Sequence, residues 1–216
     1  MKKPIVLCLT LLMLFSFGAI AGAKTLKLGL DAGPVSQDPQ VQLSGGMLQY
    51  SHMVFDPLVR WTQDMKFEPR LATRWERRDD LTMRFYLRKG VKFHDGTPFT
   101  ADDVVFSAKR LRHPDSDLRV RLSADTKVVK VDDHTVDFIT AAPNPILHVE
   151  WDTWYIMSKT WTEKHGAELP QAATKEKENY ATRHANGTGP FILVSQEPGV
   201  KTVCKVNPDW WDNANK

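Results

Sequence analysis

Seven histidines and two cysteines are the residues of this 216-residue chain with the widest chemical reach. Such side chains bind a metal ion when several converge, and the usual sequence sign is two ligands at a short, fixed spacing. The histidines are His52, His94, His113, His134, His148, His165 and His184. No two are spaced to share a helix or strand face, and neither a His-Glu-x-x-His segment nor a Cys/His cluster occurs. We therefore expect no metal ligands and no cofactor.

The serine, histidine and glycine motifs do not form a catalytic pattern. No Gly-x-Ser-x-Gly segment occurs, and Ser44-Gly45-Gly46 does not match one. His94-Asp95 lies in a turn before Gly96, which favours a surface hydrogen-bonded pair over a catalytic dyad. Asn186-Gly187-Thr188-Gly189 lacks the lysine of a phosphate loop, so we interpret it as a turn where glycine supplies a positive φ. The sequence predicts no catalytic residues and a protein that is not an enzyme.

Composition and charge indicate a folded protein without a nucleic-acid partner. Hydrophobic residues make up 42% of the chain and charged residues 25%, which is ordinary for a soluble domain. The 29 basic and 26 acidic residues are interleaved, so no basic stripe is available to neutralise phosphates.

The first 23 residues have the parts of a secretory signal peptide. Two lysines precede an apolar run over residues 5–20, and Ala21-Gly22-Ala23 provides a cleavage site. The run is short for a membrane span, and an uncleaved anchor is the alternative. We expect cleavage after Ala23, export of residues 24–216, and a monomer.

Export would leave the mature chain with one cysteine. Cleavage removes Cys8, so Cys204 has no partner for an internal disulfide in an oxidising compartment. Cys204 lies in an alternating segment, where we expect a buried apolar role rather than a reactive thiol.

Apolar periodicity predicts a mixture of helices and strands. The expected strands cover residues 25–30, 83–87, 126–131, 135–139, 191–195 and 200–206. The expected helices begin near Ser44, Thr100 and Ser158 and end near Pro57, His113 and Gly166. Thr100 is the predicted N-cap of the second helix, and Asp103 is the capping-box acid that reaches back to it. The polar stretch 168–185 reads as a loop or a loosely packed helix, and the whole pattern predicts an α/β or α+β fold with a mixed sheet.

Two groups of tryptophans have open roles. Trp151 and Trp154 lie in one aromatic cluster, which either lines a ligand cleft or seals the edge of a core. For Trp210-Trp211, which follows Asn207-Pro208, packing is the favoured interpretation.

Five segments, taken together and in order, form a specific pattern. The longest runs from Tyr86 to Ser107 and contains Lys92-Phe93-His94-Asp95-Gly96-Thr97-Pro98 followed by Thr100-Ala101-Asp102-Asp103. The others are Phe55-Asp56-Pro57-Leu58-Val59, Leu71-Ala72-Thr73-Arg74-Trp75-Glu76, Gly187-Thr188-Gly189-Pro190-Phe191 and Asn207-Pro208-Asp209-Trp210-Trp211. In these segments the chain resembles the family 5 extracellular solute-binding proteins, the dipeptide and oligopeptide receptors of ABC importers. The resemblance covers nearly all of residues 24–216.

The resemblance implies an α/β, periplasmic binding protein-like (type II) lobe with a mixed β-sheet, and a ligand held between two lobes that close about a hinge. It also implies that a peptide or another small solute is delivered in the periplasm to an ABC permease of the inner membrane. Counting from Asp38-Pro39, it places the ligand backbone against Leu43, Ser44 and Gly45, next to Gly46. Backbone pairing would tolerate varied side chains. Trp151 completes the expected ligand-binding residues, and a plain helix entry is the alternative for residues 44–46.

Length is the main departure from this family, whose members are typically more than twice as long. We expect residues 24–216 to be an incomplete N-terminal lobe, truncated before the second lobe. The alternatives are a non-functional remnant of such a receptor, or a receptor for a nickel chelate, heme or another small solute. A secreted hydrolase is a third class, which the missing triad and metal site disfavour.

Overall fold

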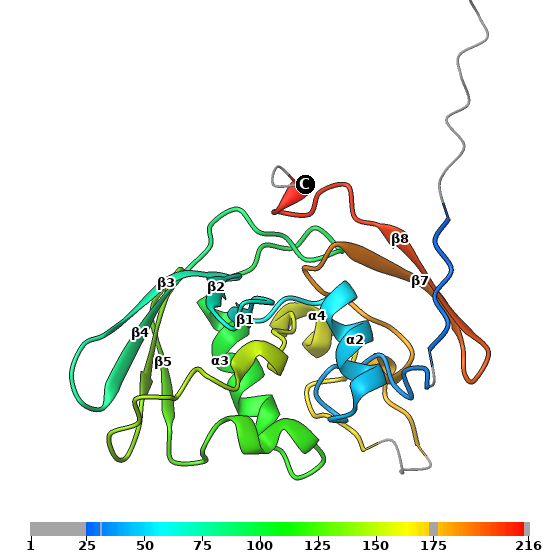
Figure 1. The fold of residues 1–216 in the computed structure, drawn as a ribbon. Coiled ribbons are helices and arrows are strands. Elements are labelled where there is room, and N and C mark those ends of the chain that lie inside the picture. Colours follow the sequence, from blue (N-terminus) through cyan, green and yellow to red (C-terminus); the bar gives the residue numbers. More distant parts are fainter. Residues whose placement is uncertain (1–24, 31, 173–176, 214–216) are drawn as a thin grey trace, which may run out of the picture. The chain divides into compact units, whose positions relative to one another are not determined.

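The computed structural model describes residues 25–30, 32–172 and 177–213 (Figure 1). The predicted signal peptide, residues 1–23, lies outside this part. Within it, no helix has the length and apolar character needed to cross a membrane. The chain divides into two compact units, residues 1–30 and 31–216, and the elements named below lie in the second.

The strand predicted over residues 25–30 is not formed, since these residues carry neither helix nor strand structure. Alternating apolar side chains define the two faces of a strand, but the strand itself needs hydrogen bonds from a neighbour. The alternating residues report only on their own segment and do not show whether a partner strand lies beside it.

The three α-helices and five of the eight strands described in the second unit were predicted from the sequence, and the strands over residues 59–61, 67–69 and 72–77 were not. The α-helices are α2 (Gly45–Val54), α3 (Ala101–Leu111) and α4 (Lys159–Lys164). Short 3-10 turns cover Asp117–Arg121, Trp151–Thr153 and Tyr180–Thr182. The strands are β1 (Val59–Trp61), β2 (Phe67–Pro69), β3 (Ala72–Arg77), β4 (Thr82–Leu87), β5 (Lys127–Asp132), β6 (Thr135–Ile139), β7 (Phe191–Glu197) and β8 (Lys201–Val206).

The largest described sheet has the strand order β3-β4-β6-β5, and β1-β2 and β7-β8 form two smaller sheets. All of these pairings are antiparallel. The α/β prediction is confirmed, but the mixed sheet expected from the sequence is not formed within the described strands. Short turns join β3 to β4, β5 to β6 and β7 to β8, and a short turn reverses the chain, so these three pairs must be antiparallel.

The core lies between the four-stranded sheet and α3, which packs against β5 and β6 (Figure 1). Alternate residues of β4, namely Met83, Phe85 and Leu87, are buried, as the period-two pattern predicts. Phe85 meets Phe138 of β6 edge to face, with ring centroids 5.3 Å apart. The buried side chains on this face of the sheet belong to the main hydrophobic core of the second unit.

The start of α3 shows the predicted capping box. The Thr100 N–H donates to Asp103 Oδ2 at 2.8 Å, and the reciprocal bond completes the box. The other carboxylate oxygen of Asp103 accepts the Lys159 N–H at 2.9 Å, which joins α4 to α3. Burial raises the pKa of Asp103 to about 6, against the opposing effect of these hydrogen bonds. One side chain thus caps a helix and positions its neighbour.

Gly187 and Gly189 are required by close packing, which corrects the interpretation of this motif as a positive-φ turn. Neither residue has a positive φ. The Gly189 N–H donates to the Val54 carbonyl at 3.0 Å, at the end of α2. A Cβ on Gly187 would overlap the same carbonyl oxygen, and one on Gly189 would lie 2.6 Å from the Val54 carbonyl carbon. The absence of side chains lets two backbone segments touch.

His94 fastens this glycine segment and does not pair with Asp95. Its Nε2 lies 3.1 Å from the Gly189 carbonyl oxygen, and its Nδ1 accepts the Gly187 N–H at 3.3 Å. Asp95 instead accepts hydrogen bonds from the backbone and hydroxyl of Thr97. The two contacts suit a neutral imidazole with its proton on Nε2, and burial lowers the pKa of His94.

Replacing Gly187 by alanine tests the close packing. We expect Gly187→Ala to lower the free energy of unfolding by about 3 kcal/mol or more, because the added methyl group meets backbone that cannot move aside. Urea denaturation measures the change. Gly45→Ala is the control, since a Cβ there meets nothing within 4 Å. Equal stabilities for the two variants would contradict the packing role.

Acid should weaken the His94 junction. The folded chain holds His94 with a lowered pKa, so the unfolded chain binds the proton more readily below about pH 6.5. The stabilisation is therefore complete above that pH and is lost as the pH falls. We expect the drop in unfolding free energy between about pH 7.5 and pH 5 to be smaller in His94→Gln than in the unchanged chain. An equal or larger drop in the variant would contradict the assignment.

Candidate functional site

Residues 43–46, called the contact segment below, form an exposed stretch of backbone at the start of α2. Leu43 is 37% exposed, Gly45 is exposed and Ser44 is half-buried. Ser44 has extended backbone and is the N-cap, and its carbonyl accepts the Leu48 N–H at 2.9 Å. The N–H groups of Leu43, Ser44 and Gly45 make no hydrogen bond within the part of the chain that the structure describes. Each can donate a hydrogen bond to an acceptor on an outside partner.

Gly46 differs from the rest of the contact segment. A Cβ there would lie 2.6 Å from the Ala32 carbonyl oxygen, so the residue is small because backbone passes close to it. At Gly45 the equivalent position is open for 4 Å. The structure therefore gives Gly46 a packing role and leaves Gly45 accessible.

The loop before the contact segment is buried and held by a salt bridge. Asp38 and Arg110 of α3 have side chains that are 2% and 0% exposed. Arg110 Nη1 donates to one Asp38 oxygen at 2.9 Å, and Nη2 donates to the other. Arg110 also donates to Gln40 Oε1 at 3.1 Å and to the Ala167 carbonyl at 3.3 Å. Such a bidentate pair fixes direction as well as distance.

Gln40 adds contacts from its backbone and side chain. Its carbonyl accepts the Ser116 hydroxyl at 2.7 Å. Its side-chain amide lies 3.3 Å from the Tyr155 carbonyl oxygen and 3.4 Å from that of Ser107. Asp38, Gln40, Arg110 and Ser116 are called the polar anchor below.

Trp151, the remaining predicted binding residue, lies in the core and has no exposed surface. Its ring is 4.5 Å from that of Phe138 and 5.1 Å from that of Trp154, and its Nε1 donates to the Arg121 carbonyl at 3.0 Å. Of the two interpretations of this cluster, the structure supports the core. A ligand cannot reach Trp151 in this arrangement, because aromatic side chains and β-strands enclose it.

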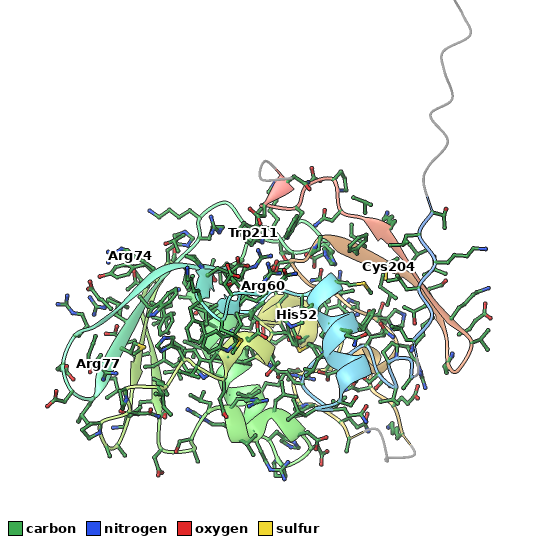
Figure 2. All side chains as sticks on the ribbon, in the orientation of Figure 1. His52, Arg60, Arg74, Arg77, Cys204 and Trp211 are labelled. Atoms are coloured by element: carbon green, nitrogen blue, oxygen red, sulfur yellow. The ribbon has the colours of Figure 1, made fainter. Side chains whose placement is uncertain are left out.

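His52 and Asp152 form a contact that the sequence did not reveal. His52 Nε2 is 3.7 Å from Asp152 Oδ2, and the other Asp152 oxygen accepts the Trp61 N–H at 3.2 Å. Burial lowers the pKa of His52, and the Asp152 charge opposes that shift. Figure 2 shows His52 on α2 and Arg60 on β1 in this region. The residues are 100 positions apart, so no spacing rule could have paired them.

Asp56 is a second buried junction that sequence reasoning missed. One carboxylate oxygen pairs with Arg70 at 2.9 Å. The other accepts hydrogen bonds from the side chains of Thr188 (3.0 Å), Trp211 (2.9 Å) and Trp210 (3.4 Å). The Arg70 guanidinium lies 4.8 Å from the centre of the Trp211 ring, which Figure 2 labels. The packing predicted for Trp210-Trp211 is therefore present, with an acidic partner.

Metal-ligating chemistry finds no geometric support among the described residues, where no three His, Cys, Asp or Glu side chains converge. Cys204 is half-buried against the cluster of Tyr50, Val54, Phe55 and Tyr155. Burial raises the pKa of the Cys204 thiol, so it holds little of the reactive thiolate at neutral pH.

Residues 66–216 match the family described as bacterial extracellular solute-binding proteins, family 5, middle. The chain belongs to this family. The probable D,D-dipeptide-binding periplasmic protein DdpA of Escherichia coli (strain K12) is 28% identical, over 98% of this chain and 41% of that protein. The dipeptide-binding protein of the same strain is 30% identical, over 93% of this chain and 41% of that protein.

Solved structures agree with this membership. Haemophilus influenzae OppA, in complex with RPPGFSPFR, superposes with a TM-score of 0.71 at 25% identity, over 85% of this chain and 38% of that one. A dipeptide-binding protein from pseudoalteromonas sp. SM9913, in complex with Met-Leu, gives 0.69 at 26% identity, over 83% and 39%. The family 5 receptor of the sequence analysis is confirmed at the level of family and fold, and this chain spans about 40% of the length of the relatives.

Breaking the buried pair tests the polar anchor. Asp38→Ala leaves the Arg110 guanidinium buried without a counter-charge, and we expect it to lower the free energy of unfolding by about 3–5 kcal/mol. The double variant Asp38→Leu with Arg110→Met should recover much of this loss. Urea denaturation gives both values. Glu163→Ala is the control, since the exposed Lys159–Glu163 pair, 3.9 Å apart, should change stability by less than about 0.5 kcal/mol.

Proposed function

We propose that this chain is the N-terminal part of a periplasmic receptor that captures an oligopeptide or a similar small solute for an ABC permease of the inner membrane. The chain is exported with a signal peptide cleaved after Ala23, residues 24–216 belong to one lobe, and the receptor acts as a monomer. It performs no chemistry on its ligand. Family membership supports this function. So do a relative that is named as a dipeptide-binding protein and two related structures that were solved in complex with peptides.

The accessible contact segment is the observation that carries the proposal. Leu43, Ser44 and Gly45 offer backbone N–H groups that make no hydrogen bond within the described residues. An extended peptide can accept hydrogen bonds from such N–H groups with its own backbone carbonyls, which are the same in every peptide. This mode of recognition accounts for a receptor that accepts many sequences.

A single lobe should bind weakly. Closure of two lobes buries most of a ligand, and one lobe contacts one side of it. Less apolar surface is then removed from water, while the loss of ligand mobility on binding is similar. We therefore expect millimolar rather than micromolar affinity from residues 24–216 alone.

The test is an NMR titration of the mature chain with the dipeptide Met-Leu and with RPPGFSPFR. We expect the amide resonances of Leu43, Ser44 and Gly45 to shift at about millimolar peptide, and those of exposed strand β5 to stay unchanged. Gly45→Leu is the matched variant. Position 45 has room for a side chain, and we expect the added leucine to block access of the peptide to the neighbouring N–H groups.

Three results would argue against the proposal or its contact segment. Unchanged spectra with both peptides at several times the millimolar range would favour the non-functional remnant. Shifts produced by a nickel–histidine complex but by neither peptide would favour a metal-chelate receptor. Peptide shifts that survive Gly45→Leu would place the contact elsewhere on the lobe.

A further inference from the structure

We infer that the polar anchor is the positioning device of the contact segment, and that Ser116 and Arg110 set ligand affinity without touching the ligand. This inference rests on the proposed function of residues 43–46. None of the anchor side chains is exposed: Asp38, Gln40, Arg110 and Ser116 are all buried. Any effect they have on a ligand must therefore pass through the backbone that they hold.

The anchor acts on the contact segment from its N-terminal side. Only two residues, Val41 and Gln42, separate Gln40 from Leu43. Val41 is itself buried, so this short connection has little freedom. A displacement of the Gln40 carbonyl, which the Ser116 hydroxyl holds at 2.7 Å, is transmitted directly to the exposed backbone.

Helix α2 holds the other side. The contact segment runs into its first turn, and buried Met47, Tyr50 and Val54 fix the helix against its neighbours. Tyr155 lies between the two supports, because its hydroxyl donates to the Leu48 carbonyl and its backbone carbonyl accepts from Gln40. The exposed backbone is thus clamped between two buried supports that share a residue.

Directional bonds suit this task better than apolar packing. The anchor fixes the loop through a bidentate pair and hydrogen bonds to the backbone of separate elements, including Ala167 and Ser107. Apolar side chains could fill the same volume in several loop conformations, whereas satisfied buried polar bonds favour one. A receptor that pairs with peptide backbone needs its own backbone in register before the ligand arrives, since segments that must be ordered on binding lower the affinity.

Two serines provide a matched pair of variants. Ser116→Ala removes the hydroxyl that holds the Gln40 carbonyl. Ser107→Ala also removes a fully buried hydroxyl of the same region, but the hydrogen bonds of that hydroxyl go to the backbone of Met157 and not to the loop. The Ser107 carbonyl, which accepts from Gln40, is kept in this variant. Both should lose stability to a similar degree, and only the first should loosen the contact segment. Asp38→Asn is a second probe that keeps the side-chain shape and removes the charge.

The first measurement is backbone ¹⁵N relaxation of the free mature chain. We expect greater mobility at Leu43, Ser44 and Gly45 in Ser116→Ala than in Ser107→Ala or the unchanged chain. The second is the dissociation constant for Met-Leu. We expect Ser116→Ala to raise this dissociation constant about three- to tenfold, because the contact segment would hold its binding conformation for only part of the time. Ser107→Ala should change it less than about twofold.

The outcomes separate this inference from the proposed function. Equal mobility and equal affinity in the two serine variants would overturn the inference while peptide binding stands. Greater mobility in Ser116→Ala with unchanged affinity would also overturn it, because the anchor would then not govern binding. If no peptide binds the unchanged chain, the proposed function fails, and relaxation alone decides whether the anchor positions the segment.

Discussion

The carboxylate of Asp56 holds together parts of the chain that are far apart in sequence. It accepts hydrogen bonds from Thr188, 132 positions away, and from Trp211, 155 positions away, while it pairs with nearby Arg70. Burying a carboxylate costs free energy unless an opposite charge and hydrogen bonds compensate it. The buried position of Asp56 therefore depends on all of these donors. The end of α2, the glycine segment and the last described residues are positioned by this one group.

Asp38 repeats the arrangement on the other side of α2. Its partner Arg110 comes from α3, and the pair fixes the loop that precedes the contact segment. Asp56 lies two residues after the end of α2, and Asp38 lies seven residues before its start. Buried ion pairs are weak sources of net stability and strong sources of geometry. We therefore interpret both ion pairs as fixing the positions of the segments before and after α2.

Local patterns in the sequence foretold most of the helices and strands. Thr100 and Asp103 predicted the start of α3, because a capping box involves residues three apart. The alternation of Met83, Phe85 and Leu87 predicted β4, because it reports burial on one face of a strand. Where the pattern needed a distant partner, it failed, as with the strand expected over residues 25–30.

The candidate site divides in the same way. The contact segment was predicted through the family resemblance, and its exposure agrees with that role. Trp151 was placed at the ligand because an aromatic residue near loops has the same sequence signature whether it lines a cleft or fills a core. Gly187 and Gly189 were assigned to a turn because a sequence does not show which backbone passes close to a glycine.

By itself, the sequence determined the family and the local elements, since motifs and periodicity depend on residues a few positions apart. The tertiary structure decided which buried charges pair, why the glycines are small and which aromatic residues are enclosed. Those properties depend on how segments more than 50 positions apart approach each other, as Arg110 approaches Asp38 and Gly189 approaches Val54. Such approaches are set by the packing of the whole core, which no short stretch of sequence specifies.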